Sequence, residues 1–373
     1  ATTTVWTELH DRVRAVGEAR AHVLRLRGEL VRGTRWLATE TGRRLRGVTT
    51  QVQRTAHRLQ RQGRRLMRLG HAAVGTEPVD EAALRQTVEV LATVDGVLAD
   101  LPLVYRRLFS FRPIQDPDLL VARDADRAAV EHHRDRWQRG LTTPLVLTGP
   151  AGSGRTSLLN VLRKTTFRTA QRHHLEFRER LTSEADVARE VARTLNLSVD
   201  EDKSLTLNAV AEHLRFQPKP DRLRVCTVEQ FEHVLQRTVG GTQLAARVLN
   251  FFAETDARVL WVVTTTDAAW QLVEASEPAA ARLVTRHALA PVDRTELEEL
   301  ILRRHQRSGL RLIFEVPDES THPILARRLR AIDDEERRQA LMRTEFFDRL
   351  HDASGQNVML ALFYWFRAVG LDE

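Results

Sequence analysis

Cysteine is almost absent from this sequence, since Cys226 is the only one in 373 residues. A single cysteine excludes a disulfide within the chain and is typical of a protein from a reducing compartment, so we expect a cytoplasmic location. No apolar run approaches the roughly 18–20 residues that a membrane-spanning helix needs. The first residues also lack the apolar stretch of a signal peptide. The sequence therefore predicts a chain without a transmembrane segment.

Lysine is nearly as scarce as cysteine. All but three of the 57 basic residues are arginine, and the net charge is +7. This charge is unevenly distributed, because residues 1–75 carry 16 arginines against five acidic residues while the remainder of the chain is slightly acidic. The basic character therefore belongs to the N-terminal segment, and it argues against a nucleic-acid surface on the rest of the chain.

Patterns for zinc-dependent or nucleophilic hydrolysis are also missing. The 14 histidines include two adjacent pairs, yet none has the spacing of a zinc site. No Ser/His/Asp constellation can be placed, and no internal repeat is visible. These absences disfavour zinc hydrolases, serine hydrolases and repeat proteins.

The most informative stretch is residues 144–159, which read as a buried strand, a glycine-rich loop and the first turn of a helix. This stretch matches the phosphate-binding pattern Gly-x-x-x-x-Gly-Lys-[Ser/Thr] at every position but one, where Arg155 replaces the lysine. In such a P-loop the glycines let backbone N–H groups point at phosphate, and the helix N-terminus faces the anion. The residues expected to bind nucleotide are Gly149, Gly152, Ser153, Gly154, Arg155, Thr156 and Ser157.

The arginine in the P-loop changes the expected chemistry. Lysine is a compact point charge, whereas the guanidinium of Arg155 is longer, planar and bidentate. We expect the loop amides and Thr156 to hold a nucleotide while Arg155 either clamps an outer phosphate or swings away. The alternative is an ordinary glycine-rich turn, but the strand, the spacing and the apolar helix all agree with a P-loop.

Residues 223–232 have the form of a Walker B strand. An acidic residue at the end of such a strand holds Mg²⁺, and the next acid polarises the attacking water. Here the acidic pair is replaced by Glu229-Gln230, and glutamine cannot accept a proton. We therefore predict weak or absent hydrolysis unless Glu232 takes the role of the base. The predicted Mg²⁺ ligands are Thr156 and Glu229.

A third apolar strand, residues 259–266, ends in a run of threonines. Thr265 is the candidate for the sensor residue that lies beside the γ-phosphate. Arg282 and Arg286 follow, just before a predicted edge strand at residues 287–289. The predicted catalytic residues are Glu229, Gln230, Glu232 and Thr265.

The order of these motifs resembles that of the AAA+ and STAND ATPases over roughly residues 119–368. Residues 119–126 are similar to the box of an apolar residue, glycine, arginine and an acid that packs over the adenine in those families. Ala122 stands in the place of the glycine, and Arg123 matches the arginine. In ring-forming relatives, a trans-acting arginine lies near the position of Arg282 and Arg286.

The C-terminal part resembles a STAND lid. Residues 289–293 are similar to the entry of that lid, with Pro291 as its proline, and residues 355–357 cap a helix similar to one in STAND and origin-recognition-like lids. No arginine stands at the start of this helix, where a sensor 2 residue is expected. This departure favours STAND over ring-forming AAA+ proteins.

The resemblance implies an α/β fold with a three-layer αβα P-loop NTPase core, a parallel sheet and a C-terminal helical lid. It also implies that ATP or ADP binds with Mg²⁺, in contact with Arg123, the P-loop and Pro291. The expected domains are a basic helical arm at 1–75, a helical linker at 76–118, the core at 119–292 and the lid at 293–373.

The N-terminal arm is predicted to be helical and similar to a coiled coil. Apolar residues recur every seven positions, and residues 41–76 carry nine arginines and no acid. One interpretation is a solvated helical hairpin, and the other is a surface for an acidic partner, whether protein, nucleic acid or anionic lipid. The apolar seam favours a protein partner or a homo-oligomer, with nucleic acid as the alternative.

Three functions are compatible with these features. The first is a nucleotide-dependent switch or assembly scaffold with weak or no hydrolysis, which the weak Walker B acids favour. The second is a DNA-engaging AAA+ ATPase of the helicase-loader or transposition-regulator type, which the basic arm favours. The third is a pseudo-ATPase that serves as a structural subunit of a larger complex.

Overall fold

The computed structural model describes residues 101–197, 205–218, 221–236, 238, 240–317 and 322–370. The chain divides into two compact units. One comprises Arg112–Pro291 and is called the sheet unit below; the other, the helical unit, holds the described residues up to Phe111 and those from Val292 onward. The basic arm predicted for residues 1–75 and most of the linker predicted for 76–118 lie outside the described residues, and the domain boundaries stay a prediction.

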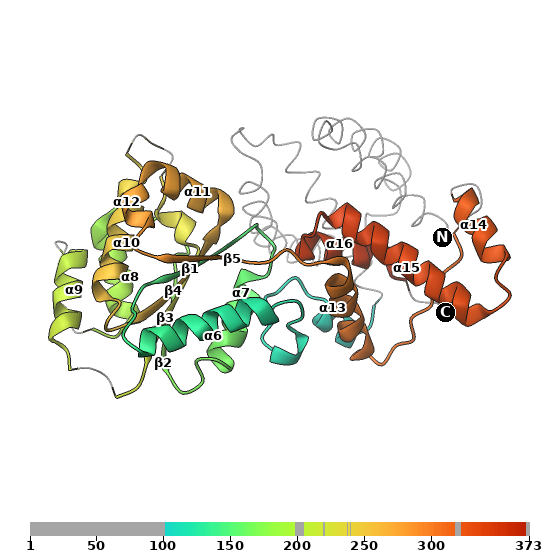
Figure 1. Cartoon of the computed structure of the whole chain (residues 1–373), viewed down its shortest axis with the longest axis horizontal. Helices are drawn as coiled ribbons and strands as arrows, with labels where there is room; N and C mark the ends of the chain where they lie inside the picture. The colour runs from blue at the N-terminus through green and yellow to red at the C-terminus, as the bar shows by residue number, and fades with distance from the viewer. Residues whose placement is uncertain are drawn as a thin grey trace, which may run out of the picture. The chain divides into compact units, whose positions relative to one another are not determined.

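The sheet unit is built on five strands in the order β2-β3-β4-β1-β5. Every pair is parallel, so the carboxyl ends of all the strands lie along one edge of the sheet. This arrangement confirms the predicted parallel α/β sheet (Figure 1). The strands are β1 (Leu145–Gly149), β2 (Gln171–Glu176), β3 (Arg224–Glu229), β4 (Leu260–Thr266) and β5 (Thr285–Ala288).

Helices cover both faces of this sheet, which produces the three layers. On β4 the side chains of Leu260 and Val262 pack with one helical layer, while Trp261 and Val263 pack with the other. Both faces of the sheet are covered by apolar side chains that exclude water, so the central strands consist of nearly continuous apolar residues. One layer holds α6 (Asp124–Gln138) and α7 (Arg155–Lys164). The other holds α8 (Glu184–Thr194), α9 (Leu207–Phe216), α10 (Gln243–Thr255), α11 (Asp267–Ser276) and α12 (Pro278–Ala281).

Local sequence signals explain several boundaries. Ser183 caps α8, because its Oγ accepts a hydrogen bond from the Asp186 backbone N–H at 3.2 Å. Helix α6 begins at Asp124. Acidic residues in its first turn favour a start at this position, since they complement the helix dipole. Two short 3₁₀ turns complete the unit, η2 (Pro117–Leu119) and η3 (Phe231–Val234).

The helical unit packs around aromatic side chains. The Trp365 Nε1–H donates to the Tyr105 hydroxyl at 3.0 Å, and the Trp365 ring stacks on Phe109 and Phe347. As predicted, Asn357 caps the last helix by accepting hydrogen bonds from two backbone N–H groups. The helices are α5 (Leu103–Leu108), α13 (Arg294–Gln306), α14 (Pro323–Arg330), α15 (Glu335–Ser354) and α16 (Val358–Ala368). In the described part of the chain, no helix has the length and apolar character to cross a membrane.

Candidate functional site

The predicted P-loop connects β1 to α7 at the carboxyl edge of the sheet. Gly152 and Gly154 have φ angles of 83° and 92°, in the left-handed region that glycine adopts without strain. Gly149 is held closely against the loop, because a Cβ at this position would lie 2.9 Å from Ser153 Oγ. Gly154, which the motif requires, therefore has a backbone conformation that favours glycine, whereas at Gly149 a side chain would press on the Ser153 hydroxyl.

The start of α7 is ready to bind an anion. No described side chain caps this helix, and its first backbone N–H groups have no acceptor within the helix. The Oγ of Ser153 is buried and has no hydrogen-bond partner among the described residues. An orphaned hydroxyl beside uncapped amides fits a phosphate group, because the dipole at a helix N-terminus favours negative charge.

The predicted magnesium ligands lie together. The Thr156 hydroxyl on α7 donates to Glu229 Oε2 at 2.6 Å, and Glu229 is the last residue of β3 with a side chain 7% exposed. A hydroxyl and a carboxylate are oxygen ligands that suit Mg²⁺, which takes one or two protein ligands together with phosphates and water. Within the described ranges there is no cluster of three or more His, Cys, Asp or Glu that would bind a metal by itself. The residues present fit a nucleotide-bound Mg²⁺.

The other predicted catalytic residues divide into two groups. The Thr265 hydroxyl on β4 donates to Glu232 Oε2 at 3.2 Å, so the candidate sensor and the candidate base are adjacent. Gln230 has a left-handed φ of 59°, and its Nε2 donates to Glu176 Oε1 at 2.9 Å, at the end of β2. Glu232 thus shares a hydrogen bond with the candidate sensor Thr265, whereas Gln230 forms one with the neighbouring strand.

Arg155 is the first residue of α7 and faces carboxylates. Burial lowers its pKa, and attraction to Glu232, then Asp267, then Glu229 acts in the opposite direction. Asp267 is a site residue that the motif search missed. It directly follows the threonine run of β4, and this position at the strand end is the signal that could have identified it.

Two basic groups lie near Glu229 on its other side. His174 Nε2 is 3.8 Å from Glu229 Oε1, and Arg163 on α7 also attracts that carboxylate. Burial lowers the pKa of His174, the charge of Arg163 lowers it further, and Glu229 partly offsets both. We therefore expect His174 to be neutral at pH 7. Neither residue belongs to a recognisable sequence motif.

Arg123 lies next to the P-loop. Its guanidinium donates to the Ser153 carbonyl oxygen at 2.7 Å and to the Ala290 carbonyl oxygen at 2.6 Å. Pro291 follows Ala290 and ends the sheet unit. Contacts of Arg123 and Pro291 with a nucleotide stay a prediction.

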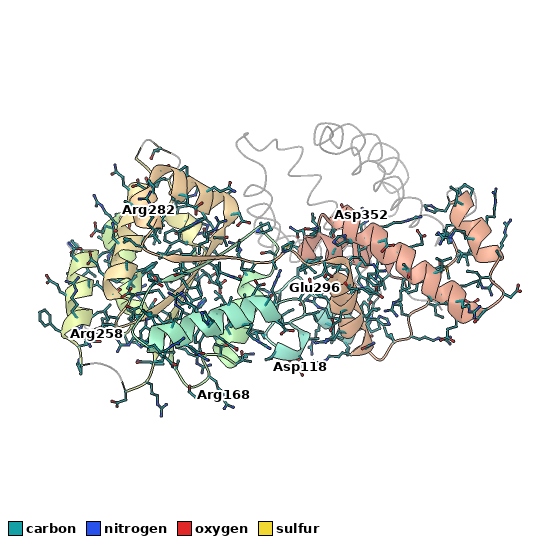
Figure 2. The ribbon with its side chains drawn as sticks, viewed as in Figure 1. Asp118, Arg168, Arg258, Arg282, Glu296 and Asp352 are labelled. Carbon is teal, nitrogen blue, oxygen red and sulfur yellow. The ribbon has the colours of Figure 1, made fainter. Side chains whose placement is uncertain are left out.

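The two arginines near β5 have different surroundings. Arg286 donates to the Thr148 hydroxyl at 3.3 Å and lies 3.6 Å from Asp267, so it is engaged within its own unit. Arg282 directly follows α12 and is exposed, and Figure 2 labels it beside the helices of the sheet unit. A trans-acting role for either arginine stays a prediction.

Comparison with known proteins agrees with this geometry. A family model described as Novel STAND NTPase 1 matches residues 105–328. The chain belongs to this family. The resemblance to AAA+ and STAND ATPases is therefore confirmed, and the residues that match this STAND NTPase family include the candidate P-loop, the candidate Walker B strand and Arg123. A search of curated proteins found no match.

Several solved structures resemble this STAND NTPase at low sequence identity. The Aeropyrum pernix ORC1 protein in complex with DNA is 17% identical, with 65% of this chain and 64% of that chain covered and a TM-score of 0.41. Cdc6p from Pyrobaculum aerophilum is also 17% identical, with 68% and 66% covered and a TM-score of 0.41. The ADP form of the Aeropyrum pernix ORC2 protein is 14% identical, with 69% and 72% covered and a TM-score of 0.41. The chain thus spans slightly less than two thirds of the first two proteins.

Proposed function

We propose that this STAND NTPase binds ATP or ADP with Mg²⁺ and acts as a nucleotide-dependent switch or assembly scaffold with weak or no hydrolysis. The observation that supports this most directly is the loop between β1 and α7. Its left-handed glycines, its uncapped helix and the hydrogen bond from Thr156 to Glu229 combine an anion site with a pair of oxygen ligands.

Each residue of the site has a proposed role. The amides at the start of α7 hold phosphate oxygens, and Thr156 and Glu229 hold Mg²⁺. When bound, the metal neutralises the phosphate charge and orients the phosphates. Arg155 balances the carboxylates around it in the absence of nucleotide, and it moves to an outer phosphate when nucleotide binds.

Weak hydrolysis follows from the residues available as a base. Gln230 cannot accept a proton, and its amide is bonded to Glu176. Glu232 carries a carboxylate beside Thr265, so it is the residue proposed to orient water if turnover occurs. A site that binds tightly and turns over slowly holds its nucleotide state long enough to act as a switch.

Thermal unfolding with added nucleotide tests the binding proposal. We expect ADP or ATP with Mg²⁺ to raise Tm, because a ligand at a hundredfold excess over Kd stabilises the folded state by about 2.7 kcal/mol. Gly154→Val should abolish the shift, since valine is strained at a φ of 92°. Arg134→Ala on α6 serves as the control, because Arg134 bonds to Asp135 and Thr166 instead of the P-loop.

The absence of any shift with millimolar ATP or ADP would contradict nucleotide binding. The pseudo-ATPase interpretation, in which the fold is kept as a structural subunit, would then be preferred. A rise in Tm with both ATP and ADP, without release of phosphate from ATP, would support the proposal that the protein is an assembly scaffold.

A second candidate function is a DNA-engaging ATPase. It is favoured by residues 1–75, whose net charge of +11 suits phosphate contacts. If this function is correct, the logarithm of DNA affinity must fall linearly with the logarithm of salt concentration, and deletion of residues 1–75 must abolish binding. DNA binding that survives the deletion would place the interface elsewhere, and undetectable binding by the full chain would eliminate this candidate.

A further inference from the structure

A buried arginine joins three separate segments of the sheet unit. Arg123 is only 4% exposed. Its Nη2 donates to the Ser153 carbonyl in the P-loop at 2.7 Å, and its Nη1 donates to the Ala290 carbonyl after β5 at 2.6 Å. The same Nη1 lies 3.1 Å from Asp126 Oδ2. One side chain therefore fixes the P-loop, the start of α6 and the end of the sheet unit.

The carboxylate that pairs with this arginine is also fully engaged. Asp126 is 1% exposed, and its Oδ1 accepts hydrogen bonds from His287 Nε2 at 2.7 Å and from the Ala290 backbone N–H at 3.3 Å. Ala290 is thus held through its N–H by Asp126 and through its carbonyl by Arg123. The contacts among the buried Arg123 and Asp126 and the partly exposed His287 form a single network, called the Arg123 network below.

The fold brings these segments together by a simple route. Strands β1 and β5 are parallel neighbours, and the Leu289 N–H donates to the Thr148 carbonyl at 2.8 Å, so the chain leaves β5 beside the P-loop. Ala122 adopts a left-handed φ of 62° and directs the chain into α6, whose first turn carries Asp126. The network therefore depends on backbone geometry that is local to the P-loop edge.

We propose that the Arg123 network is a positioning relay that couples the P-loop peptide at Ser153 to the segment at Ala290. The inference rests on the proposed nucleotide binding and goes beyond it, because it names the residues through which nucleotide is sensed. Arg123 acts here on the backbone, and it does so whether or not it also contacts the adenine.

The physical reason for coupling is the cost of a broken contact. A buried guanidinium that loses an acceptor is left with an unsatisfied charged donor, which is strongly unfavourable. Nucleotide at the P-loop fixes the peptide of Ser153, and Arg123 must keep its bond to that carbonyl. Because the other nitrogen holds Ala290, ordering of the P-loop also orders the segment that follows β5.

Hydrogen exchange of the full chain, with and without ADP and Mg²⁺, tests this relay. In the wild type we expect ADP at a hundredfold excess over Kd to slow exchange in residues 150–156 and in 288–292, by up to about 100-fold where opening requires nucleotide release. The variant His287→Ala removes a donor from Asp126, the carboxylate that pairs with Arg123 and accepts from the Ala290 N–H. In this variant we expect ADP still to protect the P-loop, while the exchange rate of residues 288–292 changes by less than about twofold.

Two further variants separate coupling from general loss of structure. His287→Gln retains a donor and should restore protection of 288–292. Asp126→Asn cannot accept from Arg123 and from the Ala290 N–H at the same time, so it should uncouple the segments as His287→Ala does. Arg134→Ala, the control on the same helix, should behave as the wild type because its acceptors are Asp135 and Thr166.

The outcomes distinguish the relay from the proposed function. Protection of the P-loop but not of 288–292 in the wild type would overturn the relay and leave nucleotide binding intact. Protection of neither segment would overturn nucleotide binding and the relay with it. Coupled protection that persists in His287→Ala and Asp126→Asn would also overturn the relay, since the contacts would then be dispensable.

Discussion

Arg155 is the residue that most distinguishes this P-loop. It stands where lysine is usual, and it is attracted to three carboxylates at the sheet edge. Replacing it with lysine shortens the group, and replacing Gln230 with glutamate supplies a proton acceptor. We expect the double variant Arg155→Lys/Gln230→Glu to raise steady-state ATP turnover above the wild type. A wild-type rate of about 1 s⁻¹ or more, within the ordinary enzyme range, would refute the idea of a degenerate site.

Glu229 provides a second prediction at the residue scale. Glu229→Gln keeps an acceptor for the Thr156 hydroxyl but removes the charge that attracts a metal. The gain in ADP affinity that Mg²⁺ provides should therefore fall by about 10–100-fold, as measured by calorimetry with and without the metal. Glu176→Gln is the matched control at the end of β2, where the carboxylate bonds to Gln230. An unchanged metal dependence in Glu229→Gln would show that Mg²⁺ binds elsewhere.

Among the elements, β2 carries a histidine that links stability to pH. His173 Nδ1 donates to the Thr194 carbonyl at 2.7 Å, while its Nε2 is buried and has no described partner. Burial lowers the pKa of His173 below its usual 6.5, so the unfolded state binds more protons as pH falls through that range. Stability is then fully present above about pH 6.5 and declines below it.

The test is the dependence of Tm on pH between about 5 and 8. His173→Asn retains a donor toward Thr194 but does not titrate, so the decline in Tm below pH 6.5 should become shallower. Burial also lowers the pKa of His133 and of His305, so part of the decline should remain. His132→Gln on the exposed side of α6 is the control. A variant with the same slope as the wild type would exclude His173 as a contributor.

The central strands were predictable because both of their faces are buried. β1, β3 and β4 show as apolar runs, and the P-loop and Walker B residues are fixed by their position at the ends of these runs. β2, which begins at Gln171, could not be recognised in the same way. As an edge strand, β2 exposes polar side chains that do not form an apolar run.

The Arg123 network and the position of Asp267 could not be predicted from the sequence. Arg123, Ser153 and Ala290 are far apart in the chain, and only the pairing of β5 with β1 brings them together. Sequence motifs record residues near one another in the chain, whereas this network depends on sheet order. The motif search therefore identified Arg123 but not what it holds.

At the scale of the whole molecule, the basic arm of residues 1–75 is the segment for which we expect a binding partner. Nine arginines without an acid between residues 41 and 76 repel one another, so we expect them to be matched by a partner. If that partner is a second copy or another protein, Val52→Asp on the apolar seam should dissociate the assembly in sedimentation experiments. Leu45 and Leu59 are spaced seven residues from Val52 in the sequence, so we expect substitutions of them by aspartate to have the same effect. If deletion of residues 1–75 changes neither the oligomeric state nor the salt dependence of binding, the arm is an ordinary solvated hairpin.

The helical unit is formed by two stretches of chain separated by the whole sheet unit. Tyr105 lies near the start of the described chain and Trp365 near its end, yet the two side chains share a hydrogen bond in one core. During synthesis the sheet unit has all its residues long before α16 exists, so it can fold first. The contacts of Tyr105 and Phe109 with Trp365 then form only after the residues of α16 have been made. Shortening the chain before residue 358 should therefore leave a native sheet unit joined to a collapsed, aggregation-prone remnant.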